Sequence, residues 1–313
     1  MIDRIYNALS RHPWLTMAGA VFLQTAFSLN SRALWFSDEV RYANAYENME
    51  RAGAWVVLAL NGMPYPDKPP VYFWFLSLLD NLTPFDPPAV FFVGAALSGL
   101  GFLYATYWLG RVLGLSRDRC LGAALITLST LFFAAVLHYS RMDLMFAALI
   151  VATSACLART FVRDGASGWA VLGFGLAGLA VLVKGPLGIL FPLLALAFYL
   201  AWRGKLRRMT SAPVLLGLAV AALVAACWVL AAWIVEGPDF VRTVFVEQIF
   251  QRAANTFHHK EGFSYYFAVL PAVWLPWTLF LFGLPLTLLF TRTFWSGLLR
   301  GRKTADPART WLW

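Results

Sequence analysis

The sequence predicts an all-α polytopic membrane protein with about eight transmembrane helices. Of its 313 residues, 60% are hydrophobic and only 13% are charged, and the mean hydropathy is +0.65. That apolar share is well above the share found in soluble domains. Apolar stretches of roughly 17–25 residues, the length that crosses a bilayer as a helix, recur along the chain. The expected spans are 14–34, 89–109, 120–138, 143–162, 168–183, 187–202, 213–235 and 265–290.

The fifth and sixth expected spans are short, and only Lys184-Gly185-Pro186 separates them. A single re-entrant pair is therefore an alternative to two full crossings. With either reading, we expect one transmembrane domain over residues 1–313.

The basic residues predict the orientation in the membrane. If the N-terminus is cytoplasmic, the inside segments contain 16 of the 25 Lys and Arg residues and four of the 16 acids. The outside segments contain the other nine bases and twelve acids. This bias follows the positive-inside rule and places both termini in the cytoplasm. We therefore expect a multi-pass protein of the bacterial inner (plasma) membrane.

The sequence also argues against several partners. The bases are scattered through short loops, so the net charge of +9 does not predict a nucleic-acid-binding surface. No GxGxxG or Walker pattern is present. This argues against a nucleotide-sugar donor and against an ATP-driven pump.

Two long outside loops, about 35–88 and 236–264, carry patterned rather than disordered sequence. Within 38–51 and 239–252, apolar residues recur at helical spacing with polar residues around the rest of the wheel. Both patterns predict amphipathic helices in the periplasmic membrane interface. The aromatic run 71–75 predicts a third interfacial element.

The first outside loop opens with a charged phrase at the edge of the hydrocarbon, where ionisable groups are costly and usually functional. One interpretation of Asp38 is a carboxylate that faces a substrate, since a positioned carboxylate can remove the proton of a hydroxyl nucleophile. The alternative is a helix cap, which Asp favours at such a position. Glu39 lies about 100° further round the helix, and we expect it to pair with Arg41 or to meet water.

A second charged phrase, Asp67-Lys68-Pro69-Pro70, follows in the same loop. Lys68 is the only base between Arg51 and the second span. A lysine suits a lipid phosphate at the membrane surface, and it would stabilise the charge that grows on a leaving phosphate. The alternative is a simple turn, because proline disfavours helical backbone in the residue before it.

These phrases resemble the first outside loop of polyprenyl-phosphate-dependent glycosyltransferases of the C-type fold. That group includes the lipid A aminoarabinose transferase and, more distantly, the protein O-mannosyltransferases. The matching first-loop pattern is Trp35-x-x-Asp38-Glu39-x-Arg41-Tyr42-Ala43, Gly53-x-Trp55 and Tyr65-x-Asp67-Lys68-Pro69-Pro70-x-Tyr72-x-Trp74. Later matches are Ser140-Arg141-Met142-Asp143, Lys184-Gly185-Pro186-x-Gly188, and His258-His259 before Tyr265-Tyr266-Phe267.

The resemblance implies transfer of a sugar from a polyprenyl-phosphate carrier at the periplasmic face. The acceptor would be lipid A, another envelope glycan or a protein hydroxyl. It implies Asp38 and Asp143 as catalytic carboxylates, although Asp143 could instead pair with Arg141 or cap a helix. The implied substrate-binding residues are Glu39, Arg41, Tyr42, Lys68, Arg141, Lys184 and Lys260. For two of these, ordinary roles stay open: Lys184 as a snorkelling residue and Lys260 as a loop charge.

A divalent metal is left open, with Asp67, His258 and His259 as candidate ligands. A zinc site needs three or four ligands from one cavity. No other cofactor is expected. Family members usually continue through further spans, so we expect this chain to correspond to their N-terminal part.

A transporter or flippase of lipid-linked saccharides is the alternative function. Such proteins place charged groups at mid-membrane on broken helices. Here nearly all ionisable residues fall at the ends of expected spans. This placement favours the enzyme.

Overall fold

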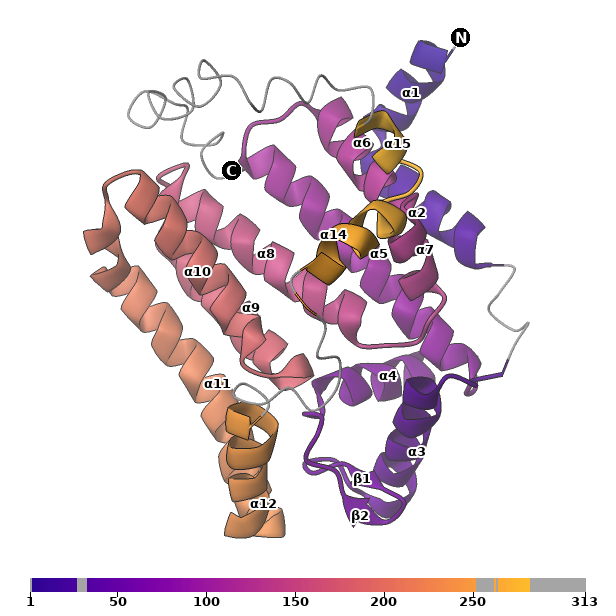
Figure 1. The fold of residues 1–313 in the computed structure, drawn as a ribbon, viewed down its shortest axis with the longest axis vertical. Coiled ribbons are helices and arrows are strands. Elements are labelled where there is room, and N and C mark those ends of the chain that lie inside the picture. The colour runs from indigo at the N-terminus through magenta and orange to yellow at the C-terminus, as the bar shows by residue number, and fades with distance from the viewer. Residues whose placement is uncertain (1, 27–32, 252–261, 263, 282–313) are drawn as a thin grey trace.

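The long helices lie side by side as a bundle (Figure 1). The structure is a computed structural model that describes residues 2–26, 33–251, 262 and 264–281. Helix α5 packs on α8, α8 packs on α9, and α9 packs on both α10 and α11. These bundle helices are α5 (Ala89–Val112), α8 (Asp143–Phe161), α9 (Gly168–Lys184), α10 (Leu187–Trp202) and α11 (Ala212–Glu236). A short 3₁₀ helix, η1 (Leu206–Thr210), links α10 to α11.

The N-terminal helices α1 (Ile2–Arg11) and α2 (Pro13–Thr25) pack on α6 (Arg117–Leu128), which forms a broken pair with α7 (Leu131–Leu137). The expected continuous span 120–138 is wrong in this respect, because α6 and α7 are bent by 71°. Thr130 starts α7 by accepting the backbone N–H of Phe133 at 3.2 Å, which is the role of a helix N-cap.

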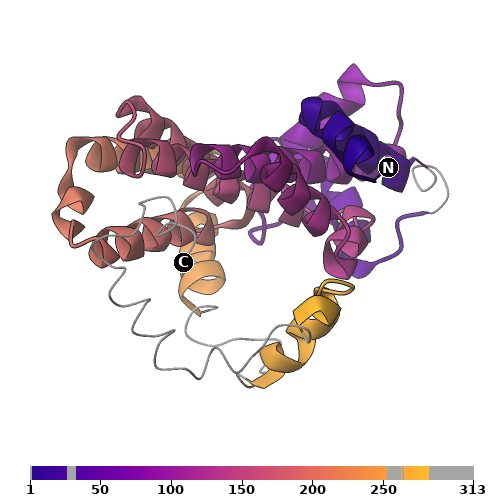
Figure 2. The ribbon, with the colours of Figure 1, turned by 90° about the horizontal axis from the view of Figure 1, so that it is seen from above.

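Within the described residues, α5, α8 and α11 are long and apolar enough to cross a membrane, and the α6–α7 pair would make a fourth span. Helices α9 and α10 are apolar but shorter, at 17 and 16 residues. The short helices α14 (Ser264–Val273) and α15 (Thr278–Leu281) lie on one face of the bundle (Figure 2). The prediction of eight spans is thus not confirmed.

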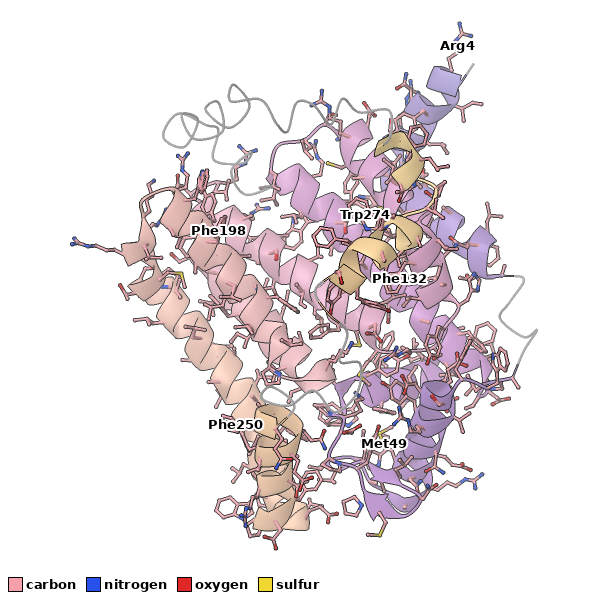
Figure 3. All side chains as sticks on the ribbon, viewed as in Figure 1. Arg4, Met49, Phe132, Phe198, Phe250 and Trp274 are labelled. Atoms are coloured by element: carbon pink, nitrogen blue, oxygen red, sulfur yellow. The ribbon has the colours of Figure 1, made fainter. Side chains whose placement is uncertain are left out.

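The outer surface of the helices is rich in large apolar side chains. Phe132, Phe198 and Phe250 are 58%, 62% and 66% exposed, and they lie on separate elements (Figure 3). Exposed phenylalanines around a bundle are expected where lipid rather than water is the solvent.

The first outside loop folds against one end of the bundle (Figure 1). It contains α3 (Ser37–Ala52), the short hairpin of β1 (Ala59–Leu60) with β2 (Met63–Pro64), and α4 (Val71–Leu82). The helix predicted over 38–51 is confirmed as α3, with its predicted apolar face buried. In α4, Tyr72 and Phe73 are fully buried against α3, so the aromatic run 71–75 belongs largely to the protein core rather than to the membrane surface.

The second outside loop is helical as predicted over its described residues 238–251. It contains α12 (Pro238–Thr243) and the π-helix η2 (Val244–Gln251). Phe240 packs in a small cluster with Val57 and Ala232. The two outside loops are therefore packed together, through residues 57 and 240.

Candidate active site

A row of alternating charges lies where the first outside loop meets the bundle. We call it the charge row; it consists of Arg41, Asp38, Arg141, Asp143 and Lys184. Arg41 pairs with Asp38 Oδ1, and Arg141 Nη2 lies 3.0 Å from Asp38 Oδ2. Arg141 Nε lies 3.1 Å from Asp143 Oδ2, and Lys184 pairs with Asp143 Oδ1. Three cations and two anions give the row a net charge of +1.

Helix ends hold the charge row in place. Asp38 is in the first turn of α3 and Asp143 is the first residue of α8, while Lys184 is the last residue of α9. Carboxylates at helix N-termini and cations at C-termini are favoured by the helix dipole. The sequence left open whether Asp143 pairs with Arg141 and whether Lys184 is a snorkelling residue. In the structure Asp143 forms ion pairs with both Arg141 and Lys184.

Glu39 is fully buried and fastens the outside loop to the bundle. Its carboxylate accepts the backbone N–H groups of Trp35 at 3.3 Å, Phe36 at 3.4 Å and Ser140 at 2.9 Å. The expectation that Glu39 pairs with Arg41 or meets water is therefore wrong. Instead, its carboxylate accepts hydrogen bonds from backbone N–H groups at the start of α3, as in a capping box. Because it sits inside the protein, Glu39 positions the site rather than facing a substrate.

Neighbouring cations, rather than water, stabilise the ionised form of Asp38. Its side chain is 16% exposed, and burial raises its pKa. The hydrogen bond from Arg41 and the charges of Arg141, Arg41 and Lys68 outweigh that burial, so the pKa of Asp38 lies below its usual value. Both carboxylate oxygens contact guanidinium groups, so Asp38 is not a simple helix cap.

Tyr42 and Tyr65 support the row from the core side. Tyr42 is 1% exposed and packs edge-on against Phe73, with ring centroids 5.7 Å apart. Burial, followed by the charge of Asp67, raises the pKa of Tyr65 to about 12. Both hydroxyls stay protonated at neutral pH. Because its side chain is buried against Phe73, Tyr42 packs α3 onto α4 beneath the charge row.

Two cavities flank the Asp143–Lys184 ion pair. The first, which we call the lysine cavity, has a volume of about 300 Å³ and contains Lys68 and Lys184 at its polar end. Its other walls are mostly apolar residues of α9, α11 and η2. The second, the aspartate cavity, has a volume of about 410 Å³ and contains Asp143 among apolar and aromatic residues of α5 to α8 and α14. The ion pair therefore has a mostly apolar cavity on either side.

The remaining predicted residues are the candidate metal ligands and Lys260. His258, His259 and Lys260 lie outside the described residues. Asp67 lines the lysine cavity and accepts the Tyr65 hydroxyl at 3.5 Å. Among the described residues, no group of three His, Cys, Asp or Glu side chains could hold a metal. The metal remains a prediction.

Sequence reasoning missed Trp228, and it quoted Ser140 only as part of a motif without giving it a role. Trp228 lines the lysine cavity, and its indole N–H donates to the carbonyl of Val56 at 2.9 Å, which joins α11 to the first outside loop. Ser140 donates its hydroxyl to the carbonyl of Phe91 at 2.9 Å. A Trp seven residues before the end of an expected span could have indicated an interfacial position.

The helical bundle and the charge row at its end define a polytopic membrane protein with a polar site at the boundary of the bundle. The chain belongs to the dolichyl-phosphate-mannose-protein mannosyltransferase family, whose model matches residues 15–237. The resemblance described from the motifs is thereby confirmed.

Curated relatives agree with this family. An undecaprenyl phosphate-alpha-4-amino-4-deoxy-L-arabinose arabinosyl transferase of Aeromonas hydrophila subsp. hydrophila is 32% identical over 257 residues, which are 80% of this chain and 46% of the relative. A similarly named transferase 2 of Proteus mirabilis is 30% identical over 276 residues, covering 87% of this chain and 49% of the relative. The chain spans about half the length of the curated relatives it matches.

Solved structures share the fold. The crystal structure of ArnT from Cupriavidus metallidurans bound to undecaprenyl phosphate superposes with a TM-score of 0.74 at 24% identity, covering 98% of this chain and 52% of that one. The apo structure of the same protein gives a TM-score of 0.70 at 23% identity.

Proposed function

We propose that this chain carries the catalytic half of a glycosyltransferase that takes a sugar from a polyprenyl-phosphate carrier. The observation that carries the proposal is the charge row between two apolar cavities. Family membership and relatives that are named undecaprenyl-phosphate-dependent arabinosyl transferases support the same chemistry. The site faces the periplasm of a bacterial inner membrane in this proposal, as the distribution of basic residues predicts.

The lysine cavity is the proposed donor site. Lys68 and Lys184 would bind the carrier phosphate as two cations, while the apolar walls would hold the first isoprene units. The charge on this phosphate grows as the sugar leaves, so fixed cations stabilise the transition state more than the ground state. Arg141 and Arg41 extend the positive charge toward the transferred sugar.

The aspartate cavity is the proposed acceptor site. Its aromatic and aliphatic lining suits acyl chains, which favours a lipid acceptor such as lipid A over a protein hydroxyl or a water-soluble glycan. Asp143 and Asp38 lie between the two cavities and would orient the acceptor oxygen. A transporter is not favoured, because the charges lie at helix ends rather than at mid-membrane.

The role of Asp38 depends on the acceptor oxygen. Each carboxylate oxygen of Asp38 contacts one guanidinium group and keeps a second lone pair, which can accept the proton of an acceptor hydroxyl. If the acceptor oxygen belongs to an ionised phosphate, no base is needed, and Asp38 holds Arg41 and Arg141 in position. In either case the carboxylate must be ionised.

The test is binding of polyprenyl phosphate to the purified full chain, with Lys68→Ala compared with Arg51→Ala. Arg51 is in the same outside loop, and its side chain is 80% exposed, so its loss removes one charge away from the cavity. We expect Lys68→Ala to weaken binding roughly ten- to hundredfold, the usual contribution of a charge-assisted hydrogen bond. Arg51→Ala should leave the affinity nearly unchanged. Equal affinities in the two variants would remove Lys68 from the donor site.

A further inference from the structure

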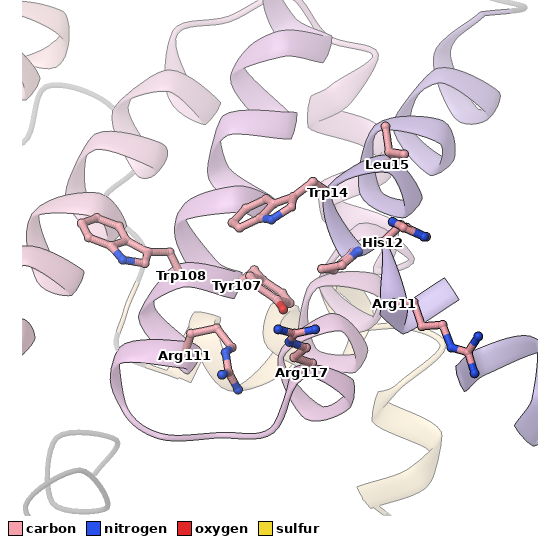
Figure 4. A pocket seen from close by; sticks show the side chains of 9 residues that line it. Arg11, His12, Trp14, Leu15, Tyr107, Trp108, Arg111 and Arg117 are labelled. Atoms are coloured by element: carbon pink, nitrogen blue, oxygen red, sulfur yellow. The ribbon is translucent and has the colours of Figure 1, made fainter. Parts of the chain in front are cut away.

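A second polar pocket lies at the end of the bundle opposite the charge row (Figures 1 and 4). Helix α5 has 24 residues and is therefore about 36 Å long. The charge row is near its first turn, and this pocket is at its last turns. The pocket has a volume of about 430 Å³. Its polar and aromatic lining is Arg11, His12, Trp14, Tyr107, Arg111 and Arg117.

The arginines of this pocket lack acidic partners within the part of the chain that the structure describes. No carboxylate there lies within ion-pair distance of Arg11, Arg111 or Arg117. Other arginines at this end are engaged: Arg208 lies 3.5 Å from Asp164, and Arg163 donates to the carbonyl of Val112 at 2.6 Å. The pocket therefore concentrates positive charge that forms no ion pair among the described residues.

Two of these arginines line the pocket together with Tyr107. Figure 4 shows the guanidinium groups of Arg111 and Arg117 on the Tyr107 side of the pocket, with Arg11 directed away. Asp118 also acts on the Tyr107 hydroxyl, with the opposite sign to the two arginines. Arg111 also donates to the carbonyl of Leu115 at 2.6 Å, which fixes its position. Asp118, in the first turn of α6, is the acid nearest in sequence.

Helix stability does not account for Arg117. It is the first residue of α6, where the positive end of the helix dipole disfavours a cation. The neighbouring Asp118 supplies the negative charge that this helix end favours. Arg117 therefore adds its charge to the pocket rather than to the stability of the helix.

The aromatic side of the pocket has the composition of a membrane interface. Trp14 is 46% exposed and packs edge-on against Tyr107, with ring centroids 4.8 Å apart, and against Tyr104 at 5.0 Å. Tyr104 donates its hydroxyl to the carbonyl of Trp14 at 3.1 Å, which holds the indole in place. Trp and Tyr at such positions sit at the level of lipid headgroups.

We propose that this pocket binds the phosphodiester headgroup of an anionic glycerophospholipid, in the leaflet opposite the charge row. Arg111 and Arg117 would donate to the phosphate oxygens, the Tyr107 hydroxyl would donate a further hydrogen bond, and Trp14 would cover the start of an acyl chain. Charge complementarity selects an anionic over a zwitterionic lipid. The site is separate from the donor and acceptor cavities.

The experiment is native mass spectrometry of the full chain, titrated separately with phosphatidylglycerol and with phosphatidylethanolamine. The test variant is Arg111→Gln with Arg117→Gln, and the matched control is Arg119→Gln with Arg207→Gln. Both control residues are exposed at the same end and lie outside the pocket. Each base near a lipid headgroup contributes about a fivefold factor, so we expect the test variant to bind phosphatidylglycerol roughly twenty- to thirtyfold more weakly. The control should resemble the wild type.

A charge-retaining variant separates binding from folding. Arg111→Lys with Arg117→Lys should keep most of the preference for phosphatidylglycerol, even if the turn after α5 is disturbed. Inorganic phosphate at the same concentration should not displace the lipid. The proposal is overturned if the control loses as much affinity as the test variant, if both lipids bind equally, or if inorganic phosphate competes as well as the lipid.

Discussion

At the scale of single residues, Asp38 and Glu39 show how adjacent carboxylates acquire different roles. Asp38 points to two guanidinium groups at the protein boundary, whereas Glu39 is buried and accepts backbone N–H groups from two segments. Helical geometry separates neighbours by about 100°, which is enough to place one side chain outward and the next inward. The sequence predicted that difference in direction but not the partner of Glu39, because Ser140 is 101 residues away.

The first residue-scale prediction concerns Asp38→Asn. The amide keeps the shape and loses the charge, so Arg41 and Arg141 lose their shared anion. If Asp38 is the general base, sugar transfer should fall on the order of 10²- to 10⁴-fold. The measurement is the transfer rate with a polyprenyl-phosphate sugar donor, and a circular dichroism melt serves as the control for folding. Wild-type transfer in the variant would leave Asp38 without a catalytic role.

The depressed pKa of Asp38 makes a related prediction about pH. An unperturbed Asp titrates near 3.9, and the pKa of Asp38 lies below its usual value, so the carboxylate is ionised at any pH above about 5. Protonation, and with it the loss of the ion pairs to Arg41 and Arg141, occurs only as the pH falls through that lowered pKa. The transfer rate should therefore show no acid limb from Asp38 between about pH 5 and 8. An acid limb in that range that disappears in Asp38→Asn would contradict this.

At the scale of elements, the Lys184-Gly185-Pro186-x-Gly188 motif acquires a physical reason. Gly185 ends α9 with φ of 101°, a backbone conformation that side chains other than glycine rarely adopt. Gly188 lies against the backbone of α9, where an added Cβ would meet the main chain of residues 180 and 181 at 2.6 Å. The tight turn between α9 and α10 thus presents Lys184 to the charge row.

The element-scale prediction is that Gly188→Ala disturbs this turn. The new methyl group clashes with backbone, which cannot rotate away, so we expect a loss of about 1–3 kcal/mol in stability, as is typical of overpacking. Donor binding should weaken with it, because Lys184 is displaced. Gly168→Ala is the matched control, since its Cβ would meet nothing within 4 Å. Thermal unfolding in detergent gives the comparison, and equal melting temperatures for the two variants would rule the clash out.

At the scale of the whole molecule, the two polar regions lie at opposite ends of a bundle about one bilayer thick. The charge row gathers segments of the first outside loop, the α7–α8 connection and the end of α9. The pocket lined by Arg11, Arg111 and Arg117 is formed by residues of α1, α2, α5 and α6 at the other end. This arrangement agrees with the uneven distribution of bases along the sequence, and it makes the orientation testable.

The orientation prediction uses single cysteines in a Cys227→Ser background, because Cys227 is the exposed native cysteine and Cys120 and Cys156 are buried. Glu50→Cys, on the exposed face of α3, should react with a membrane-impermeant maleimide in intact spheroplasts. Lys205→Cys, in the turn after α10, should react only after permeabilisation. The reverse pattern would place the charge row on the cytoplasmic side and remove the proposed periplasmic transfer.

The sequence by itself determined the class of protein and most helix positions. The predicted spans 143–162, 168–183 and 187–202 match α8, α9 and α10 within one residue at either end. Such boundaries can be read locally, because the run of apolar residues and the glycine or charge that ends it are adjacent in the chain. The motifs also indicated Asp38, Asp143 and Lys184 as members of a site.

Only the tertiary structure decided how those residues meet. Arg141 and Asp143 link Asp38 to Lys184, which is 146 positions further along the sequence. The buried hydrogen bond between Glu39 and the backbone of Ser140 holds the first outside loop beside Arg141. The break between α6 and α7, the two cavities and the pocket of arginines at the opposite end have the same origin. Each depends on which side chains stay unburied or unpaired after helices from distant segments have packed together. That packing cannot be read from any local stretch of the sequence.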